Sequence, residues 1–197
     1  MLTSVQVIGN NLPILCNQEN FILRGNNHKI TKTFPNFHCF INPAIKENLE
    51  KGRARNGMFI AVPKIIQNNV TDVSPGFWRI QAISIKSSSS TILLINSYFP
   101  QDPKTMKFDE NELKLTIQYI NKVIDENSFQ TLLWAGDINC DFLRKTGFVR
   151  QIKSFIEELP LIKSWDRFDI DFTNHQEVNE MTYVSTIDHF FWNETMN

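Results

Sequence analysis

The sequence predicts an α/β (or α+β) domain in which β-sheets pack on each other and helices cover the outside. Segments with strand character outnumber helical segments, and the strongest strands are apolar throughout, as in strands that are covered on both faces. The chain has 197 residues, which is the size of one domain. No internal repeat or linker divides it, so we expect a single domain over 1–197.

The strongest strand signals are expected at 91–99, which is almost uniformly apolar and β-branched, and at 131–135. Residues 78–85 alternate between apolar and polar side chains, which indicates another strand. The serine run 87–90 joins this strand to 91–99, so these two segments form a predicted hairpin. Further short strands are expected at 5–8, 14–16, 37–41, 58–62 and 187–192.

Two amphipathic helices are expected outside the sheets. Residues 109–126 and 147–159 both place apolar side chains along one helical face. Asp109 is a candidate N-cap for the first helix, and Pro160 ends the second. Residues 43–50 are also compatible with a helix.

The charge balance gives no support for nucleic-acid binding by the chain as a whole. Lys and Arg total 20 and Asp and Glu total 21, so the formal net charge is −1. A stand-alone nucleic-acid binder is usually basic, although a local patch can serve instead. The compact basic cluster Lys51, Arg53 and Arg55 lies in a turn-like segment, and a solvated loop is the simpler explanation of it.

The cysteines and the hydropathy pattern favour an intracellular protein, nuclear or cytoplasmic. Cys16, Cys39 and Cys140 are odd in number and lack CxxC spacing, which argues against a zinc site or a disulfide framework. The N-terminus has no basic region typical of a signal peptide. No run of about 18 apolar residues predicts a membrane span.

The first candidate for chemistry is the pair Asp137 and Asn139, which follows the apolar strand 131–135. In an extended segment two such residues point to the same side. A carboxylate there can take a proton from water, and a carboxamide can donate to a phosphate oxygen. The alternative is a plain Asx turn.

Three more polar residues lie at strand ends. Glu19 follows 14–16 and could hold a hard cation such as Mg²⁺, unless it only opens a surface loop. Tyr98 could present its hydroxyl while its ring packs, or it is a core tyrosine. Asp188 is costly to bury unless it is paired. His189 points to the opposite face of the same strand, so we expect it to be structural.

These features occur in a fixed order, as the motifs Q-E, S-Y-F-P, G-D-I-N and S-T-I-D-H-F-F. The ordered set resembles the endonuclease/exonuclease/phosphatase superfamily, and within it the endonuclease-like domains of non-LTR (LINE-type) retrotransposons. The resemblance covers nearly the whole chain. It implies a DNase I-like four-layer α/β sandwich, with two mixed sheets face to face. It also implies phosphodiester hydrolysis with Mg²⁺ (or Mn²⁺), and DNA as the partner.

The resemblance implies roles for the residues that match its motifs. Glu19 matches the metal-binding glutamate, and Asp137 matches the aspartate that activates or orients the attacking water. Asn139 matches the residue that orients this water and contacts the phosphate. Tyr98 matches the tyrosine near the scissile phosphate.

Two further matches concern the end of the domain. Asp188 matches the aspartate that orients the catalytic histidine, and Thr173 matches a threonine that hydrogen-bonds in the site. The chain contains no Ser-Asp-His motif, which carries that histidine in the superfamily. We therefore expect the domain to lack its first strand and its C-terminal Ser-Asp-His strand.

The leading functional expectation is a DNA endonuclease of the retrotransposon type, which nicks target DNA and is joined to a reverse transcriptase in an intact element. One alternative is a catalytically dead, retrotransposon-derived fragment. Another is a phosphatase or phosphodiesterase of the same superfamily that acts on a lipid or sugar phosphate, because a fold does not fix a substrate. The sequence leaves the oligomeric state open.

Overall fold

The computed structural model describes most of the chain. Its backbone is described for residues 2–5, 13–45, 57–101, 110–163, 174–178, 181–185 and 188–193, and its side chains for 13–45, 57–101, 110–163 and 188–193. Five residues singled out above lie outside these ranges: Lys51, Arg53, Arg55, Asp109 and Thr173.

The larger sheet has six strands and is mixed. β7 and β8 are parallel, and the other neighbouring strands are antiparallel. In spatial order the strands are β5 (Val70–Asp72), β6 (Ile80–Lys86), β7 (Thr91–Tyr98), β8 (Thr131–Asp137), β12 (Asp188–Asn193) and β9 (Leu161–Lys163).

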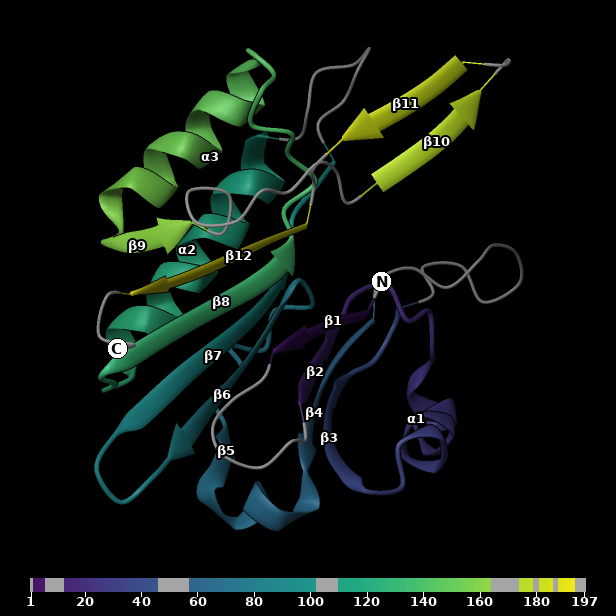
Figure 1. The fold of residues 1–197 in the computed structure, drawn as a ribbon, viewed down its shortest axis with the longest axis vertical. Helices are drawn as coiled ribbons and strands as arrows, with labels where there is room; N and C mark the ends of the chain where they lie inside the picture. The colour runs from purple at the N-terminus through teal and green to yellow at the C-terminus, as the bar shows by residue number, and fades with distance from the viewer. Residues whose placement is uncertain are drawn as a thin grey trace.

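The smaller sheet has four antiparallel strands, in the order β1 (Leu2–Val5), β2 (Ile14–Asn17), β4 (Met58–Pro63) and β3 (Phe37–Asn42). A separate two-stranded hairpin, β10 (Asn174–Val178) and β11 (Met181–Ser185), stands away from both sheets (Figure 1).

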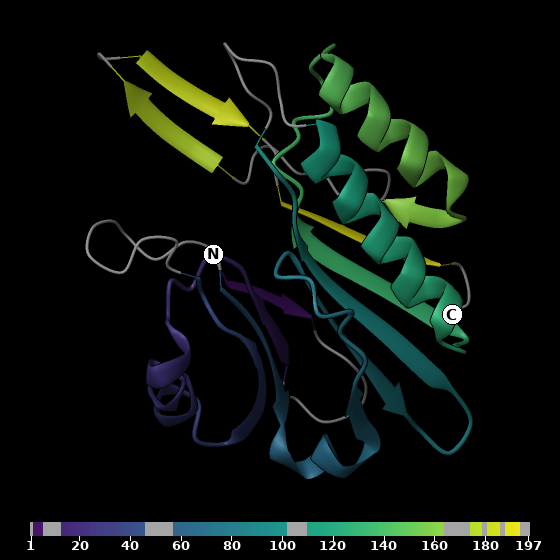
Figure 2. The ribbon, with the colours of Figure 1, turned by 180° about the vertical axis from the view of Figure 1, so that it is seen from behind.

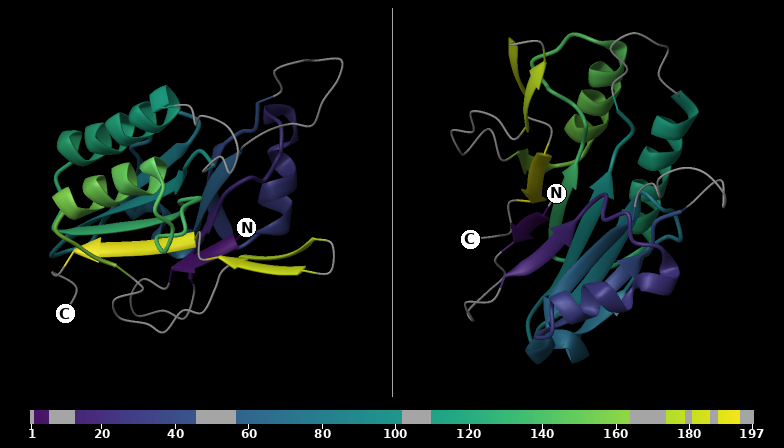
Figure 3. Two further views of the ribbon diagram at one scale, coloured as in Figure 1. Left: turned by 90° about the horizontal axis from the view of Figure 1, so that it is seen from above. Right: turned by 90° about the vertical axis from the view of Figure 1, so that its right-hand side faces the viewer.

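Helices cover the two outer faces of the paired sheets. α2 (Glu110–Glu126) and α3 (Gly147–Glu158) lie on the six-stranded sheet, whereas α1 (His28–Thr33) lies on the four-stranded sheet (Figures 1 and 2). Short 3₁₀ segments occur at Arg24–Asn26 and Lys64–Asn69. The view from above separates the four layers (Figure 3). The predicted DNase I-like four-layer sandwich is confirmed.

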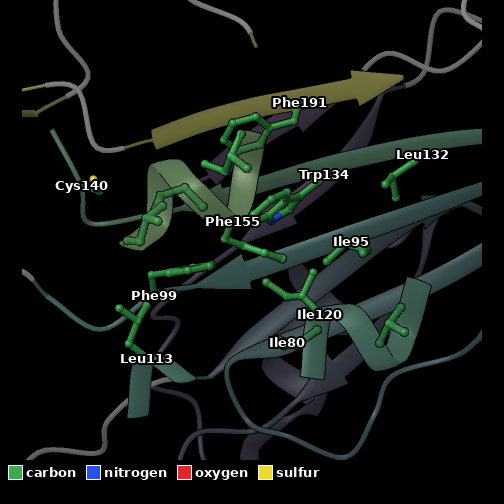
Figure 4. Close-up of a cluster of buried hydrophobic side chains, with 14 of the residues drawn as sticks. Ile80, Ile95, Phe99, Leu113, Ile120, Leu132, Trp134, Cys140, Phe155 and Phe191 are labelled. Carbon is green, nitrogen blue, oxygen red and sulfur yellow. The ribbon is translucent and has the colours of Figure 1, made fainter. Parts of the chain in front are cut away.

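The largest hydrophobic core fills the space between the six-stranded sheet and α2 and α3 (Figure 4). Trp134 of β8 is fully buried at its centre, with its ring centroid 4.6 Å from that of Phe191 and 5.8 Å from that of Phe155. The Thr146 hydroxyl caps α3 by accepting a hydrogen bond from the Val149 N–H at 3.1 Å. No helix in the described part of the chain is long and apolar enough to cross a membrane.

The long predicted elements are confirmed, and the differences concern short ones. The serine hairpin closes through the Ser87 N–H and the Ser90 carbonyl at 2.8 Å. The prediction of a helix at 43–50 is wrong at its start, where Ala44 forms a β-bridge with Leu23. Residues 46–50 lie outside the described part of the chain. The strand expected at 5–8 reaches only Val5 in the described residues. No element was predicted from the sequence at α1, β5, β9, β10 or β11.

Candidate active site

The interior between the two sheets is apolar at one end and polar at the other. Alternate residues of a strand face the same side of the sheet. In β7, Ile92 and Leu94 belong to the core between the sheets, and the same row continues as Asn96 and Tyr98. The inward-facing row of this strand therefore becomes polar toward its C-terminal end.

Three other strands repeat this change at the same place. Tyr98 lies opposite Asp137 in the β7–β8 ladder, and Asp137 lies opposite Asp188 in the β8–β12 ladder. The Tyr98 N–H donates to the Arg79 carbonyl at 2.9 Å. The inward-facing rows are Leu133, Ala135 and Asp137 in β8; Trp192, Phe190 and Asp188 in β12; and Ile85, Ile83 and Gln81 in β6, which Arg79 directly precedes.

A layer of buried amides separates the apolar end from the polar end. Gln18, Gln81 and Asn96 are at most 2% exposed. The Gln18 side chain donates to the Asn96 side-chain oxygen across the two sheets. The Asn96 Nδ2 also donates to the Asn17 carbonyl at 3.1 Å and reaches the Phe59 carbonyl at 3.4 Å. Since buried polar groups need partners, these bonds fix the two sheets relative to each other beneath the site.

Glu19 and Tyr98 meet above this amide layer. The Tyr98 hydroxyl donates to Glu19 Oε1 at 2.7 Å, so it joins the loop after β2 to the end of β7. Burial raises the pKa of Tyr98, and the bond to Glu19 raises it further. The hydroxyl is therefore a donor at neutral pH. Glu19 has a φ of 55°, a left-handed conformation that non-glycine residues adopt at a cost, most often at functional sites.

Gly57 supports the loop that carries Glu19. Its carbonyl accepts a hydrogen bond from the Asn20 N–H at 3.0 Å, and its φ is +90°. A Cβ at this position would lie 3.0 Å from Asn20 Cγ. The Asn20 side chain in turn accepts from the Ile22 N–H at 2.8 Å. Only glycine fits this conformation and this approach without strain, which explains the glycine at position 57.

Asp137 and Asn139 form an Asx turn. The Asn139 N–H donates to Asp137 Oδ1 at 2.9 Å, and Asn139 has a φ of 51°. The expectation of an extended segment through both residues is wrong, because β8 ends at Asp137 and the chain turns there. The Asn139 Nδ2 donates to the Phe99 carbonyl at 2.8 Å. The turn, and not strand alternation, brings these two residues together.

Like charges gather around Asp137. Burial is the largest effect and raises the pKa of Asp137 to about 7, and the charges of Asp188 and Glu19 raise it as well. The N–H of Asn139 opposes this shift by donating to the carboxylate. A carboxylate with a pKa near neutrality can accept a proton and return it, which is the property of a general base.

Gly136 allows Asp137 to reach this position. A Cβ on Gly136 would overlap the Ser97 carbonyl oxygen and lie 2.5 Å from Ser97 Oγ. The Ser97 hydroxyl accepts a hydrogen bond from Trp134 Nε1 at 2.8 Å, so it is fixed. The glycine of the G-D-I-N motif is thus required by the close approach of β7 and β8.

His189 lies on the other face of β12 from Asp188. It is 4% exposed, its Nε2 lies 2.9 Å from the Cys140 carbonyl oxygen, and its ring packs on Phe142 at 4.6 Å between centroids. It contributes to the core beneath α3, and it does not join the cluster that contains Asp137.

Arg79 is a site residue that the sequence did not reveal. Its guanidinium lies 5.2 Å from the centroid of the Tyr98 ring and forms an ion pair with Glu112 at 2.6 Å. In the sequence, Arg79 is one of the polar residues of a segment in which apolar and polar side chains alternate. Its burial depends on a partner 33 residues away, so local patterning gives no signal for it.

The oxygen donors at this rim fit a hard divalent cation. Among the described residues no group of three or more His, Cys, Asp and Glu side chains is close enough to hold a metal alone. Mg²⁺, however, is usually bound by one or two carboxylates together with waters and substrate phosphates. Glu19 and Asp137 are two such carboxylates, and because the charge of Glu19 raises the pKa of Asp137, a cation held by them would relieve this repulsion.

Comparisons with solved structures establish the fold of the chain. No protein-family model and no curated protein matches the chain. The endonuclease domain of TRAS1, a telomere-specific non-LTR retrotransposon, superposes with a TM-score of 0.57 at 15% identity and covers 82% of this chain and 68% of that one. The 3'-5' exonuclease NExo from Neisseria meningitidis gives a TM-score of 0.69 at 15% identity, with 95% and 79% covered.

A third similar structure is D. rerio TDP2 complexed with a single-strand DNA product, with a TM-score of 0.58, 12% identity, and 93% and 72% covered. At such identities the likeness establishes the fold. The chain has the fold of the endonuclease/exonuclease/phosphatase proteins, and the resemblance predicted from its sequence is confirmed at that level.

Proposed function

We propose that the chain is a metal-dependent phosphodiesterase that cuts DNA, as an endonuclease of the retrotransposon type. One observation carries this proposal. Glu19, Tyr98, Asp137 and Asp188 come from four separate segments and converge on one rim of the sandwich, where Asp137 has a pKa of about 7. Two strained left-handed residues, Glu19 and Asn139, lie in the same cluster.

In this proposal each residue acts on a phosphodiester and a water molecule. Glu19 holds Mg²⁺ (or Mn²⁺), which when bound offsets the phosphate charge and polarises the phosphate. Asp137 accepts the proton of the water that attacks phosphorus. Asn139 holds the Phe99 carbonyl and braces the Asp137 carboxylate, so it orients the base. Tyr98 positions Glu19 through its hydroxyl and faces the phosphate.

Asp188 and Thr173 complete the proposed site. Burial is the main cause of the raised pKa of Asp137, and the charge of Asp188 adds to it, an electrostatic role that needs no histidine. Thr173, which lies outside the described residues, would hydrogen-bond in the site as the family resemblance implies. We take 1–197 as one domain and place its activity inside the cell, in the nucleus or cytoplasm.

Similar structures support DNA as the substrate. Their names include a retrotransposon endonuclease, a NExo structure bound to a product DNA hairpin, and TDP2 with a single-strand DNA product. The retrotransposon likeness favours target nicking, with a reverse transcriptase as a partner in an intact element. A phosphatase acting on a non-nucleic phosphate shares the same fold and is the alternative substrate class.

The second candidate is a catalytically dead, retrotransposon-derived fold. The observation that favours it is where the histidines with described side chains lie. The four histidines of the chain are His28, His38, His175 and His189. Of the three with described side chains, His28 and His38 are exposed, and His189 lies on the other face of β12 from Asp188.

Supercoiled-plasmid nicking separates these functions. The protein is assayed with Mg²⁺ and with a chelator, beside a generic phosphatase substrate. Glu19→Gln is compared with Glu126→Gln, which changes an exposed glutamate at the end of α2. We expect Mg²⁺-dependent nicking that is lost in Glu19→Gln and kept in Glu126→Gln. Hydrolysis of the phosphatase substrate alone would favour the non-nucleic alternative, and no hydrolysis by folded protein would favour the non-catalytic one.

A further inference from the structure

Arg79 is a buried cation beside the proposed site. It is 6% exposed, and its Nε and Nη2 both donate to Glu112 Oε1, at 3.0 and 2.6 Å. Its Nη1 donates to the Tyr98 carbonyl at 3.1 Å. The guanidinium carbon lies 3.9 Å from the centroid of the Trp78 ring, which covers the cation. All three kinds of contact fix the orientation of the planar group.

The backbone of Tyr98 is held by Arg79 at both of its polar groups. The Tyr98 N–H donates to the Arg79 carbonyl at 2.9 Å, and the Tyr98 carbonyl accepts from the Arg79 side chain. The next residue is held from the other side, because the Phe99 N–H donates to the Asp137 carbonyl at 2.9 Å. The segment that ends β7 is therefore clamped between Arg79 and Asp137.

The ion pair links this strand end to the helical layer. Glu112 belongs to the first turn of α2, and its side chain is 33% exposed, whereas the Arg79 side chain is 7% exposed. Burial lowers the pKa of Arg79, and the hydrogen bonds and charge of Glu112 oppose that shift. Buried ion pairs contribute little net stability compared with apolar packing. In β6, which follows Arg79 directly, Ile83 and Ile85 fill the core between the sheets by packing alone.

We propose that Arg79 is a positioning residue that fixes Tyr98, and through the Tyr98 hydroxyl fixes Glu19. The planar guanidinium of Arg79 binds two partners at once. Its Nε and Nη2 donate to Glu112 of α2, while its Nη1 donates to the Tyr98 carbonyl. It is placed to act through Tyr98, and it does not need to touch the substrate. Its effect on hydrolysis rests on the proposed function, whereas its effect on Tyr98 does not.

The position of Tyr98 can be read without any assay of activity. The protein is labelled with 3-fluorotyrosine, and the ¹⁹F signal of Tyr98 is assigned with Tyr98→Phe. Arg79→Gln is expected to move and broaden this signal, because the strand end loses its clamp. Arg150→Gln, which changes an exposed arginine of α3, is expected to leave it in place. An unchanged Tyr98 signal in folded Arg79→Gln protein would overturn the proposal.

A lysine at position 79 separates shape from charge. Arg79→Lys keeps the charge but cannot bridge Glu112 and the Tyr98 carbonyl in one plane, so we expect a Tyr98 signal displaced as in Arg79→Gln. For nicking we expect kcat to fall by about tenfold or more with KM unchanged in both variants, as misplacement of a site residue does. Full rescue of the signal or of kcat by lysine would overturn the positioning role.

A second variant and the fluorine signal alone extend the test to two other cases. If Arg79→Gln does not fold, Glu112→Gln releases the guanidinium from α2 and is expected to move the Tyr98 signal in the same direction but less. An unmoved signal in that variant would count against the proposal. If the unaltered protein does not nick DNA, the fluorine signal alone decides: a displaced signal supports the clamp and leaves the proposed function rejected.

Discussion

The two faces of the six-stranded sheet are packed differently. The face toward α2 and α3 is mainly apolar, with Leu132 and Trp134 in β8 and with Ile138 and Cys140 just after it. The face toward the four-stranded sheet is apolar at Leu133 and ends in Asp137. The same strand thus supplies an apolar core on one side and a polar rim on the other.

This difference divides stability from function within single strands. Apolar burial contributes free energy in proportion to the area removed from water, so the helical face should carry most of the stability. The polar end of the other face buries amides and like charges, which cost free energy unless they are paired. Substitutions on the face toward the helices should therefore mainly lower stability. Substitutions at the polar end of the other face should mainly slow hydrolysis.

The largest effect is expected on the helical face. Phe148 of α3 is fully buried, so Phe148→Ala should lower the free energy of unfolding by about 3–5 kcal/mol, because it removes a large side chain and leaves a cavity. Nicking per folded molecule should be unchanged. Urea unfolding measures the loss, with Leu143→Ala as the control at 90% exposure. A loss below about 1 kcal/mol would contradict the assignment of the main core to this face.

The next effect is expected where the two faces meet. Gly136→Ala should cost about 2–3 kcal/mol, because the new Cβ overlaps the Ser97 carbonyl and the neighbouring strands must move apart. It should also abolish nicking, since Asp137 follows directly. Gly147→Ala is the matched control, because a Cβ there has no atom within 4 Å. Equal thermal stability of the two variants would refute the close approach of β7 and β8.

A smaller and pH-dependent effect is expected from Asp137. Its pKa is raised to about 7 in the folded protein from 3.8, so its ionisation opposes folding. The stability that it contributes is full below pH 4 and is lost as pH rises through 7. Asp137→Asn should match the unaltered protein near pH 4 and exceed it at pH 8, by on the order of 1–2 kcal/mol after allowance for solvent screening. If Asp137→Asn is instead less stable than the unaltered protein at pH 8, the raised pKa of Asp137 is contradicted.

The smallest effect is expected from the cation. Mn²⁺ at ten times its dissociation constant should raise the free energy of unfolding by about 1.4 kcal/mol, because it binds only the folded site. Thermal unfolding with and without Mn²⁺ measures this gain in the unaltered protein and in Glu19→Gln. The gain should vanish in Glu19→Gln and persist in Glu126→Gln. An equal gain in all three proteins would place the cation elsewhere.

Much of the fold was predictable because its central elements are long and uniform. Residues 92–95 and 132–135 are apolar on both faces, and the two long helices have clear amphipathic periodicity. α1 has six residues, and β5 and β9 have three each, which is too short for any periodicity to stand out. Their positions are fixed by tertiary contacts with β3, β6 and β12.

The site was predictable only in part, for a related reason. Glu19, Tyr98, Asp137 and Asp188 could be placed at strand ends, where the sequence changes from apolar to polar. The bonds that organise them join residues far apart in the chain. Gln18 and Asn96 are separated by 78 positions, and Arg79 and Glu112 by 33.

The most direct test of Asp137 as the general base is the rate of plasmid nicking by Asp137→Asn, measured beside the exposed control Asp125→Asn in protein shown to be folded. If Asp137 is the base, Asp137→Asn will be at least as stable as the unaltered protein at pH 8 but will nick DNA at least about 10³-fold more slowly, because its base is gone. Asp125→Asn should nick normally. Nicking by Asp137→Asn at the normal rate would contradict the assignment of this rim as the active site.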